Sequence, residues 1–224
     1  FLIRLSPVDP LAELRMNPSI TKQTLEAEKI RLGLDKPVIV QYFIWGKNFI
    51  RGDMGTTVSG ERVSAKIKER AFNTLLLSLS VIFWTWIIGI PLGIIAALNY
   101  RSTFDRILTV VSSIGMAIPS FFFAILLLIF AQKSGLFPIG GLTCPNFSDM
   151  DFTHKILDIA HHLFLPTVVL TTISLAGLSR QMRSNLLDVL DSDYVKFARA
   201  KGLPPSKVII KHALRNAINP LVTL

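Results

Sequence analysis

The chain has a single cysteine, Cys144, among its 224 residues, which excludes an internal disulfide framework. It contains no Gly-x-x-x-x-Gly-Lys-Ser/Thr segment, the pattern whose backbone amides bind the phosphates of a nucleotide. Asp, Glu, Lys and Arg are missing from residues 71–100 and again from residues 107–132. The chain therefore has no phosphate-binding loop of its own, and its charges are confined to certain segments.

The charge-free segments are long and apolar. Each exceeds the roughly 20 residues that a helix needs to cross a bilayer. A third apolar run, residues 163–179, reaches this length when the flanking histidines and Arg180 lie at the membrane interface. We therefore predict an all-α, polytopic membrane protein, a helical bundle with three complete spans at about 73–99, 107–132 and 163–183. Residues 1–5 and 220–224 resemble the end and the start of two truncated spans.

The segments between the spans also have predicted structure. Residues 6–70 form an external helical segment, in which Thr21 caps a helix that runs to Leu32 and stops at Gly33. The aromatic stretch 38–49 either lies at the membrane interface or packs within a small helical cap. Residues 71–190 form the transmembrane core, and residues 191–219 form a polar loop, called the 191–219 segment below.

The formal net charge of +9 does not by itself indicate nucleic-acid binding, because the basic residues are unevenly placed. From residue 180 onward eight Lys and Arg face three Asp, whereas residues 132–162 carry two Lys and three Asp. Basic loops remain on the cytoplasmic side of a membrane. We therefore expect the 191–219 segment inside the cell, residues 132–162 outside, and no nucleic-acid partner.

The 191–219 segment has the pattern of a helix, a break and a second helix. Asp191, Ser192 or Asp193 caps the first helix, and Gly202 suits the left-handed position that ends it. Pro204 and Pro205 suit the first turn of the next helix. That helix should carry a basic stripe of Lys207, Lys211 and Arg215, and on another side an apolar face of Ile210, Leu214, Ala217, Ile218 and Leu221.

These residues also resemble a known loop. Residues 194–203, with His212–Ala217 and Pro220, are similar to the conserved cytoplasmic loop of binding-protein-dependent ABC importer permeases, closest to the dipeptide/oligopeptide/nickel branch. Lys196 stands where that superfamily usually has Glu, and Phe197 replaces its first Ala. Further similar segments are Gly89–Gly93, Ile118–Phe121 and Leu165–Pro166, so that the resemblance extends over nearly the whole chain.

The resemblance implies a permease subunit of an ATP-driven importer, a multi-pass protein of the cell inner membrane that moves di- or oligopeptides. It implies no cofactor and no catalytic residue in this chain, because ATP and Mg would bind to separate ABC ATPase subunits. The other partners would be a second permease subunit, an external solute-binding protein and membrane lipid. The loop residues expected to contact the ATPases are Tyr194, Lys196, Phe197, Ala198, Arg199, Ala200, Lys201, Gly202, Lys207, Lys211, His212, Leu214, Arg215, Asn216 and Pro220.

Two other functions are compatible with the residues alone. The basic stripe would also be attracted to anionic lipid, as in a membrane scaffold or assembly protein that performs no transport. An intramembrane enzyme is disfavoured, because the spans contain no catalytic cluster. The spans also contain no ionisable residue of the kind expected in a proton relay or a voltage sensor, which disfavours an ion-coupled carrier.

Small and polar residues mark a candidate translocation pathway in the second span. They are Ser112, Ser113, Gly115, Pro119 and Ser120. Small residues permit close helix approach, and a proline frees a backbone carbonyl. The alternative is a purely structural proline kink.

The histidines raise the possibility of a metal site. His154 and His161 are seven residues apart and share a helix face, next to His162. The sequence shows no cysteine or carboxylate that completes a tight ligand set with them, so we expect no metal site.

Overall fold

The computed structural model describes residues 11, 15–16, 21–31, 33–57 and 60–223. In this part of the chain the regular structure is helical, apart from one isolated antiparallel bridge between Thr56 and Arg62, which confirms the all-α class. The chain divides into two compact units, residues 1–71 and 72–224. The predicted remnant of a span at residues 1–5 lies outside the described residues.

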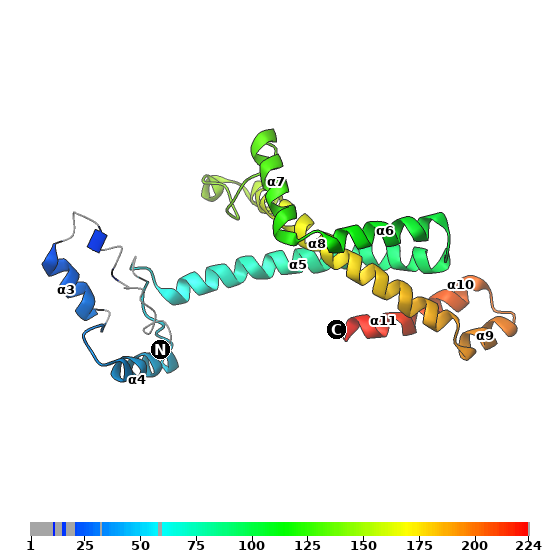
Figure 1. The fold of residues 1–224 in the computed structure, drawn as a ribbon, viewed down its shortest axis with the longest axis horizontal. Helices are drawn as coiled ribbons and strands as arrows, with labels where there is room; N and C mark the ends of the chain where they lie inside the picture. Colours follow the sequence, from blue (N-terminus) through cyan, green and yellow to red (C-terminus); the bar gives the residue numbers. More distant parts are fainter. Residues whose placement is uncertain (1–10, 12–14, 17–20, 32, 58–59, 224) are drawn as a thin grey trace. The chain divides into compact units, whose positions relative to one another are not determined.

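The helices follow one another in chain order, as Figure 1 shows. They are α3 (Lys22–Arg31), α4 (Val38–Ile50), α5 (Val63–Leu98), α6 (Thr103–Ala117), α7 (Ser120–Ser134), the short 3-10 helix η1 (Phe147–Asp149), α8 (Phe152–Leu190), α9 (Asp193–Ala200), α10 (Pro205–Lys207), the π-helix η2 (Val208–Leu214) and α11 (Arg215–Val222).

The first unit contains α3 and α4. The amide of Thr24 donates to the Thr21 hydroxyl at 3.2 Å, and Gly33 follows the helix with φ +66°, as predicted. On α4, Trp45 stacks on Phe49 with 5.2 Å between the ring centroids. The aromatic side chains of α4 are nevertheless largely exposed, which favours the membrane-interface interpretation over packing within a cap.

The two long helices of the second unit, α5 and α8, cross closely. A Cβ atom added to Gly93 would lie 2.6 Å from the carbonyl oxygen of Ser179, and one added to Gly89 would lie 3.2 Å from Leu178 Cδ2. Glycines four residues apart share a helix face, so the absence of side chains lets the two backbones approach. This contact explains the spacing of Gly89 and Gly93 around Pro91.

The segment that we predicted as one span, 107–132, is two helices. α6 and α7 meet at 91°, and α7 points away from the end of α6 in Figure 1. Ile118 is extended, with φ −80° and ψ 120°, because the ring of Pro119 clashes with a helical conformation of the residue before it. α5 and α8 are each long and apolar enough to cross a membrane, and the bent pair makes a third span if it counts as one.

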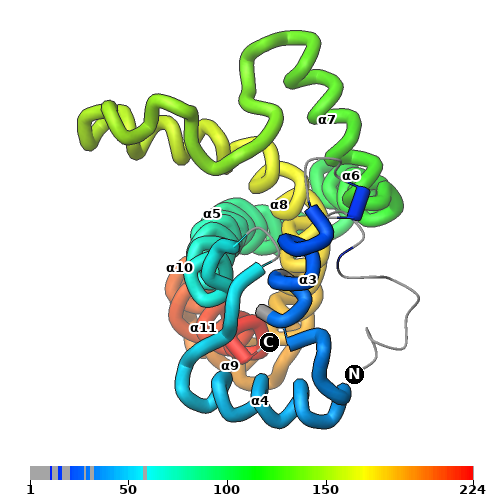
Figure 2. The backbone as a smooth tube through the Cα atoms, turned by 90° about the vertical axis from the view of Figure 1, so that its left-hand side faces the viewer, coloured from blue at the N-terminus to red at the C-terminus, as the bar shows by residue number. Residues whose placement is uncertain are grey.

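Beyond α8 the chain folds back. α8 ends at Leu190, α9 follows, and α10, η2 and α11 form a continuous run that returns along α8 (Figure 1). In Figure 2 the orange and red part of the chain lies beside α8, which it contacts through η2 and α11. The buried contact residues are Ala97, Met182, Leu186, Val195, Ala198, Val208, Ala213, Ala217 and Leu221. The 191–219 segment is thus packed on α8 as part of the same core.

The predicted apolar face of the last helix is partly wrong. Ile210 is 65% exposed, whereas Val208 and Ala213 are buried. The reason is η2, since a π-helix has a wider turn than an α-helix and brings residues five apart onto the same face. Ala217 and Leu221 are buried as predicted, because α-helical geometry resumes at Arg215.

Candidate functional site

α9 has one face on α8 and one face free. Val195 is fully buried and Ala198 is 4% exposed, whereas Tyr194 and Phe197 are 45% and 61% exposed. The sequence analysis named Ala198 but missed Val195. The three-residue spacing of two small apolar side chains was the available signal, because such residues share a helix face.

A left-handed glycine ends α9. Gly202 has φ +76°, and its amide donates to the Arg199 carbonyl at 2.9 Å. An added Cβ atom would meet no other atom within 4 Å. Glycine is therefore required here for its backbone conformation and not for space, as the sequence predicted.

Ionic and aromatic contacts surround the ends of α9. Lys196 Nζ lies 2.8 Å from Asp191 Oδ1. The hydrogen bond from Lys196 lowers the pKa of Asp191, and the same bond raises the pKa of Lys196. Lys201 Nζ lies 4.6 Å from the centroid of the Phe197 ring, a cation–π contact. Lys196 is thus already paired with a carboxylate of the same segment.

The predicted basic stripe lies on the surface. Lys207, Lys211 and Arg215 are all exposed, and Val208, Ala213 and Ala217 occupy the buried side of the same run. In the described part of the chain no carboxylate lies within ion-pair distance of the three basic groups. Their positive charge is available to a partner. Arg199, Ala200, Lys201 and Pro220 are also exposed, and His212 and Leu214 are half-buried.

Asn216 joins the two arms of the 191–219 segment. Its side-chain amide donates to the Tyr194 hydroxyl at 3.0 Å and to the His212 carbonyl at 3.2 Å. The sequence analysis placed Tyr194, His212 and Asn216 in one site, and the structure brings these three residues together.

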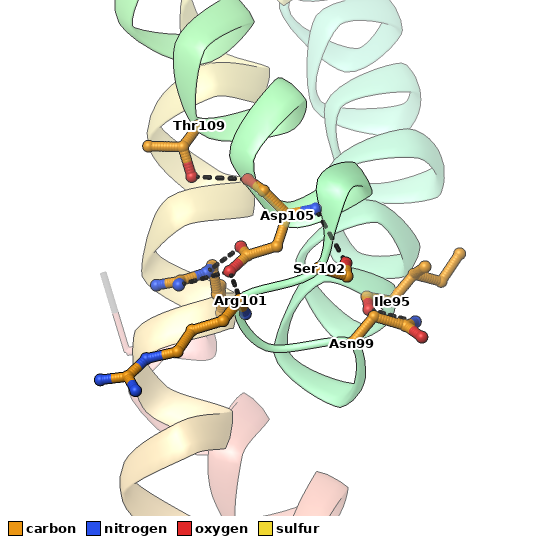
Figure 3. Close-up of polar contacts among 7 residues, drawn as sticks. Ile95, Asn99, Arg101, Ser102, Asp105 and Thr109 are labelled. Carbon is orange, nitrogen blue, oxygen red and sulfur yellow. Dashed lines mark hydrogen bonds and ion pairs between the residues drawn. The ribbon is translucent and has the colours of Figure 1, made fainter.

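A buried ion pair that the sequence analysis missed joins α8 to the first turn of α6, and Figure 3 shows the Asp105 side of this pair. Arg183 Nε lies 2.5 Å from Asp105 Oδ1, and Arg183 Nη2 lies 2.9 Å from Oδ2. The Arg101 amide donates to Oδ2 at 2.9 Å, and the Asp105 amide donates to the Ser102 hydroxyl at 3.2 Å. The Asp105 carboxylate is therefore satisfied by a guanidinium and a backbone amide at 3% exposure.

The five candidate pathway residues separate into two groups. Ser112 and Ser113 lie on α6, which packs along α8; Ser112 is buried, and the Ser113 hydroxyl accepts a hydrogen bond from Arg180 Nη2 at 3.1 Å. Gly115 approaches Thr172 on α8, where an added Cβ would lie 3.8 Å from Cγ2. Pro119 and Ser120 are exposed at the bend between α6 and α7.

The sequence analysis missed a cysteine and a carboxylate beside one of the histidines. Cys144 and Asp158 both lie next to His162, with one ligand atom of each within 4.8 Å of the others. Asp158 accepts a hydrogen bond from the Cys144 thiol, and this bond raises the pKa of the thiol. His154 instead pairs with Asp151, and His161 Nε2 contacts the Leu136 carbonyl at 2.8 Å. The sequence could not show this set, because a loop returns Cys144 to α8.

Comparisons with known proteins cover most of the chain. Residues 89–224 match the family "Binding-protein-dependent transport system inner membrane component". The oligopeptide transport system permease protein AppB of Bacillus subtilis is 41% identical over 226 residues, which are 100% of this chain and 70% of that protein. The di/tripeptide transport system permease protein DppB of Pseudomonas aeruginosa is 37% identical over 242 residues, 100% of this chain and 71% of that protein.

Proposed function

Since this chain belongs to the family of binding-protein-dependent transport system inner membrane components, we propose that it passes di- or oligopeptides across the inner membrane as a permease subunit of an ATP-driven importer. The resemblance noted in the sequence is confirmed, because permeases named for oligopeptides and di/tripeptides are similar over the full chain. The scaffold alternative has no comparable support.

The ATP would be hydrolysed by separate subunits, and the 191–219 segment is the surface that we assign to them. This chain carries no phosphate-binding loop. The segment presents exposed aromatic side chains, Tyr194 and Phe197, beside the exposed basic stripe. Aromatic side chains and Arg are typical anchors of protein interfaces, and exposed Lys and Arg together attract an acidic surface on a partner.

The single observation that carries this assignment is the joint core of the segment and α8. Val195, Ala198 and Val208 are at most 4% exposed and pack with Met182 and Leu186 of α8. A force applied to the exposed face of the segment is therefore transmitted to α8 instead of being lost in a flexible loop.

The force would reach α6 as well. Arg183 belongs to α8, and its guanidinium holds Asp105 at the start of α6. Closing of the ATPase subunits would then move α8 and α6 together and switch the spans between outward-facing and inward-facing arrangements. An external solute-binding protein would deliver the peptide, and a second permease subunit would complete the pathway.

Reconstitution tests this function. The full complex of ATPases, both permease subunits and binding protein is placed in liposomes. Uptake of a labelled oligopeptide is then measured with ATP on the side of the membrane where the ATPase subunits lie. We expect ATP-dependent uptake that is lost when this chain is omitted. Equal ATP-dependent uptake without this chain would contradict the proposal and leave the scaffold function.

A further inference from the structure

Three side chains with metal-binding chemistry meet where the loop after α7 returns to α8. Cys144 comes from the loop, and Asp158 and His162 lie one turn apart on α8. A sulfur, a carboxylate oxygen and an imidazole nitrogen from these three residues all lie within 4.8 Å of one another. The set combines the three ligand types that proteins use for zinc.

The set is held in place by the fold. The side chains of His162 and Asp158 are 4% and 7% exposed, and His162 Nδ1 lies 3.4 Å from Asp158 Oδ1. The Cys144 amide donates to Asp158 Oδ2 at 2.9 Å, and His162 Nδ1 contacts the Asp158 carbonyl at 2.8 Å. The loop and the helix are therefore already joined at this point before any ion binds.

We propose that Cys144, Asp158 and His162 form a binding site for a divalent transition-metal cation, with Zn²⁺ as the best-fitting ion. Zn²⁺ accepts thiolate, imidazole and carboxylate ligands in one tetrahedral shell, whereas Mg²⁺ and Ca²⁺ require oxygen ligands. Three protein ligands leave the fourth position to water or to a group from another molecule.

Little movement is needed to close the shell. Metal–ligand distances of about 2.0–2.3 Å place the ligand atoms of a tetrahedron about 3.3–3.8 Å apart, compared with the present upper limit of 4.8 Å. On binding, the Cys144 thiol gives its proton to solvent and becomes a thiolate ligand. The cation then carries one thiolate and one carboxylate, so its two positive charges are balanced within the site.

The test measures alkylation at Cys144, the only cysteine among these 224 residues, in the protein within its transport complex. A maleimide reagent is applied alone, with Zn²⁺, with Mg²⁺, and with Zn²⁺ followed by EDTA. We expect Zn²⁺ to slow alkylation at least about tenfold, Mg²⁺ to have no effect, and EDTA to restore the rate. An unchanged rate with Zn²⁺ would overturn the proposal on the unmodified protein.

Variants then test the other two ligands. His162→Ala and Asp158→Asn should each remove most of the Zn²⁺ protection, whereas His154→Ala, which changes an exposed histidine on the same helix, should keep it. Co²⁺ should give a thiolate-to-cobalt absorption band in the unmodified protein and none in Cys144→Ser. Full protection in both His162→Ala and Asp158→Asn would overturn the three-residue site, because the thiol alone would then bind the ion.

Discussion

Arg183 donates two hydrogen bonds to the carboxylate of Asp105, which lies 78 residues earlier in the sequence. The pair joins α8, which carries the 191–219 segment, to the turn that starts α6. Arg183 also lies over the Tyr100 ring, 5.4 Å from its centroid. Three elements of the molecule, α6, α8 and the turn between α5 and α6, therefore meet at one guanidinium.

Removal of either partner should destabilise the protein. Arg183→Gln leaves a nearly buried carboxylate without its cation, and loss of one partner of such a pair costs about 3 kcal/mol. Unfolding in detergent measures this free energy. Arg180→Gln serves as the matched control, because Arg180 is exposed and, among the described residues, donates to the Ser113 hydroxyl and to no carboxylate. An Arg183→Gln variant as stable as the control would refute the role of the pair.

The crossing of α5 and α8 should not tolerate a side chain at Gly93. Gly93→Ala places its methyl carbon 2.6 Å from the Ser179 carbonyl oxygen, so one backbone must move, at a cost of about 1–3 kcal/mol. Gly177→Ala is the comparison, since no atom lies within 4 Å there and alanine favours the helix by about 0.5–1 kcal/mol. Both free energies of unfolding come from the same denaturation experiment, and equal effects of the two substitutions would contradict a tight crossing.

The left-handed backbone at Gly202 should tolerate asparagine but not valine. We expect a transport complex with Gly202→Val in this chain to hydrolyse ATP with little peptide uptake, because a β-branched residue is strongly penalised at φ +76°. Gly202→Asn should retain most uptake, since asparagine tolerates this region. The ratio of peptide taken up to ATP hydrolysed is the measured quantity. Normal ratios in both variants would show that the turn does not take part in coupling.

Charge reversal tests the basic stripe. Lys207→Glu combined with Lys211→Glu should lower the recovery of ATPase subunits with the purified permease several-fold, because both side chains are exposed on the proposed docking face. Lys36→Glu combined with Lys133→Glu makes the same change in segments predicted to lie outside and should leave recovery unchanged. If recovery is undiminished while binding to anionic liposomes falls, the stripe contacts lipid and not the ATPase.

Local sequence signals predicted local structure well. Thr21, Gly33 and Gly202 bound helices as expected, because caps and left-handed glycines act within one turn of the backbone. The basic stripe is exposed as predicted, since Lys and Arg rarely lie buried without a partner.

The contacts that the sequence did not reveal depend on distant segments or on rare geometry. The sequence analysis did not single out Asp105, and its partner Arg183 becomes visible when α8 is laid against α6. The π-helix moved Ile210 to the surface, because a period of 3.6 residues does not apply there. Pro119 was expected to kink a span, but a proline in a sequence does not specify the size of the bend, which is 91° between α6 and α7.

Photo-crosslinking tests the central claim most directly, namely that an ATPase subunit holds the exposed face of the 191–219 segment. A benzophenone amino acid replaces Phe197 or Ile210, which are 61% and 65% exposed on that segment, and Leu136, which is 63% exposed on the loop after α7, is the control. The account predicts crosslinks to the ATPase from positions 197 and 210 and none from position 136. Crosslinks to the ATPase from position 136 alone would contradict it.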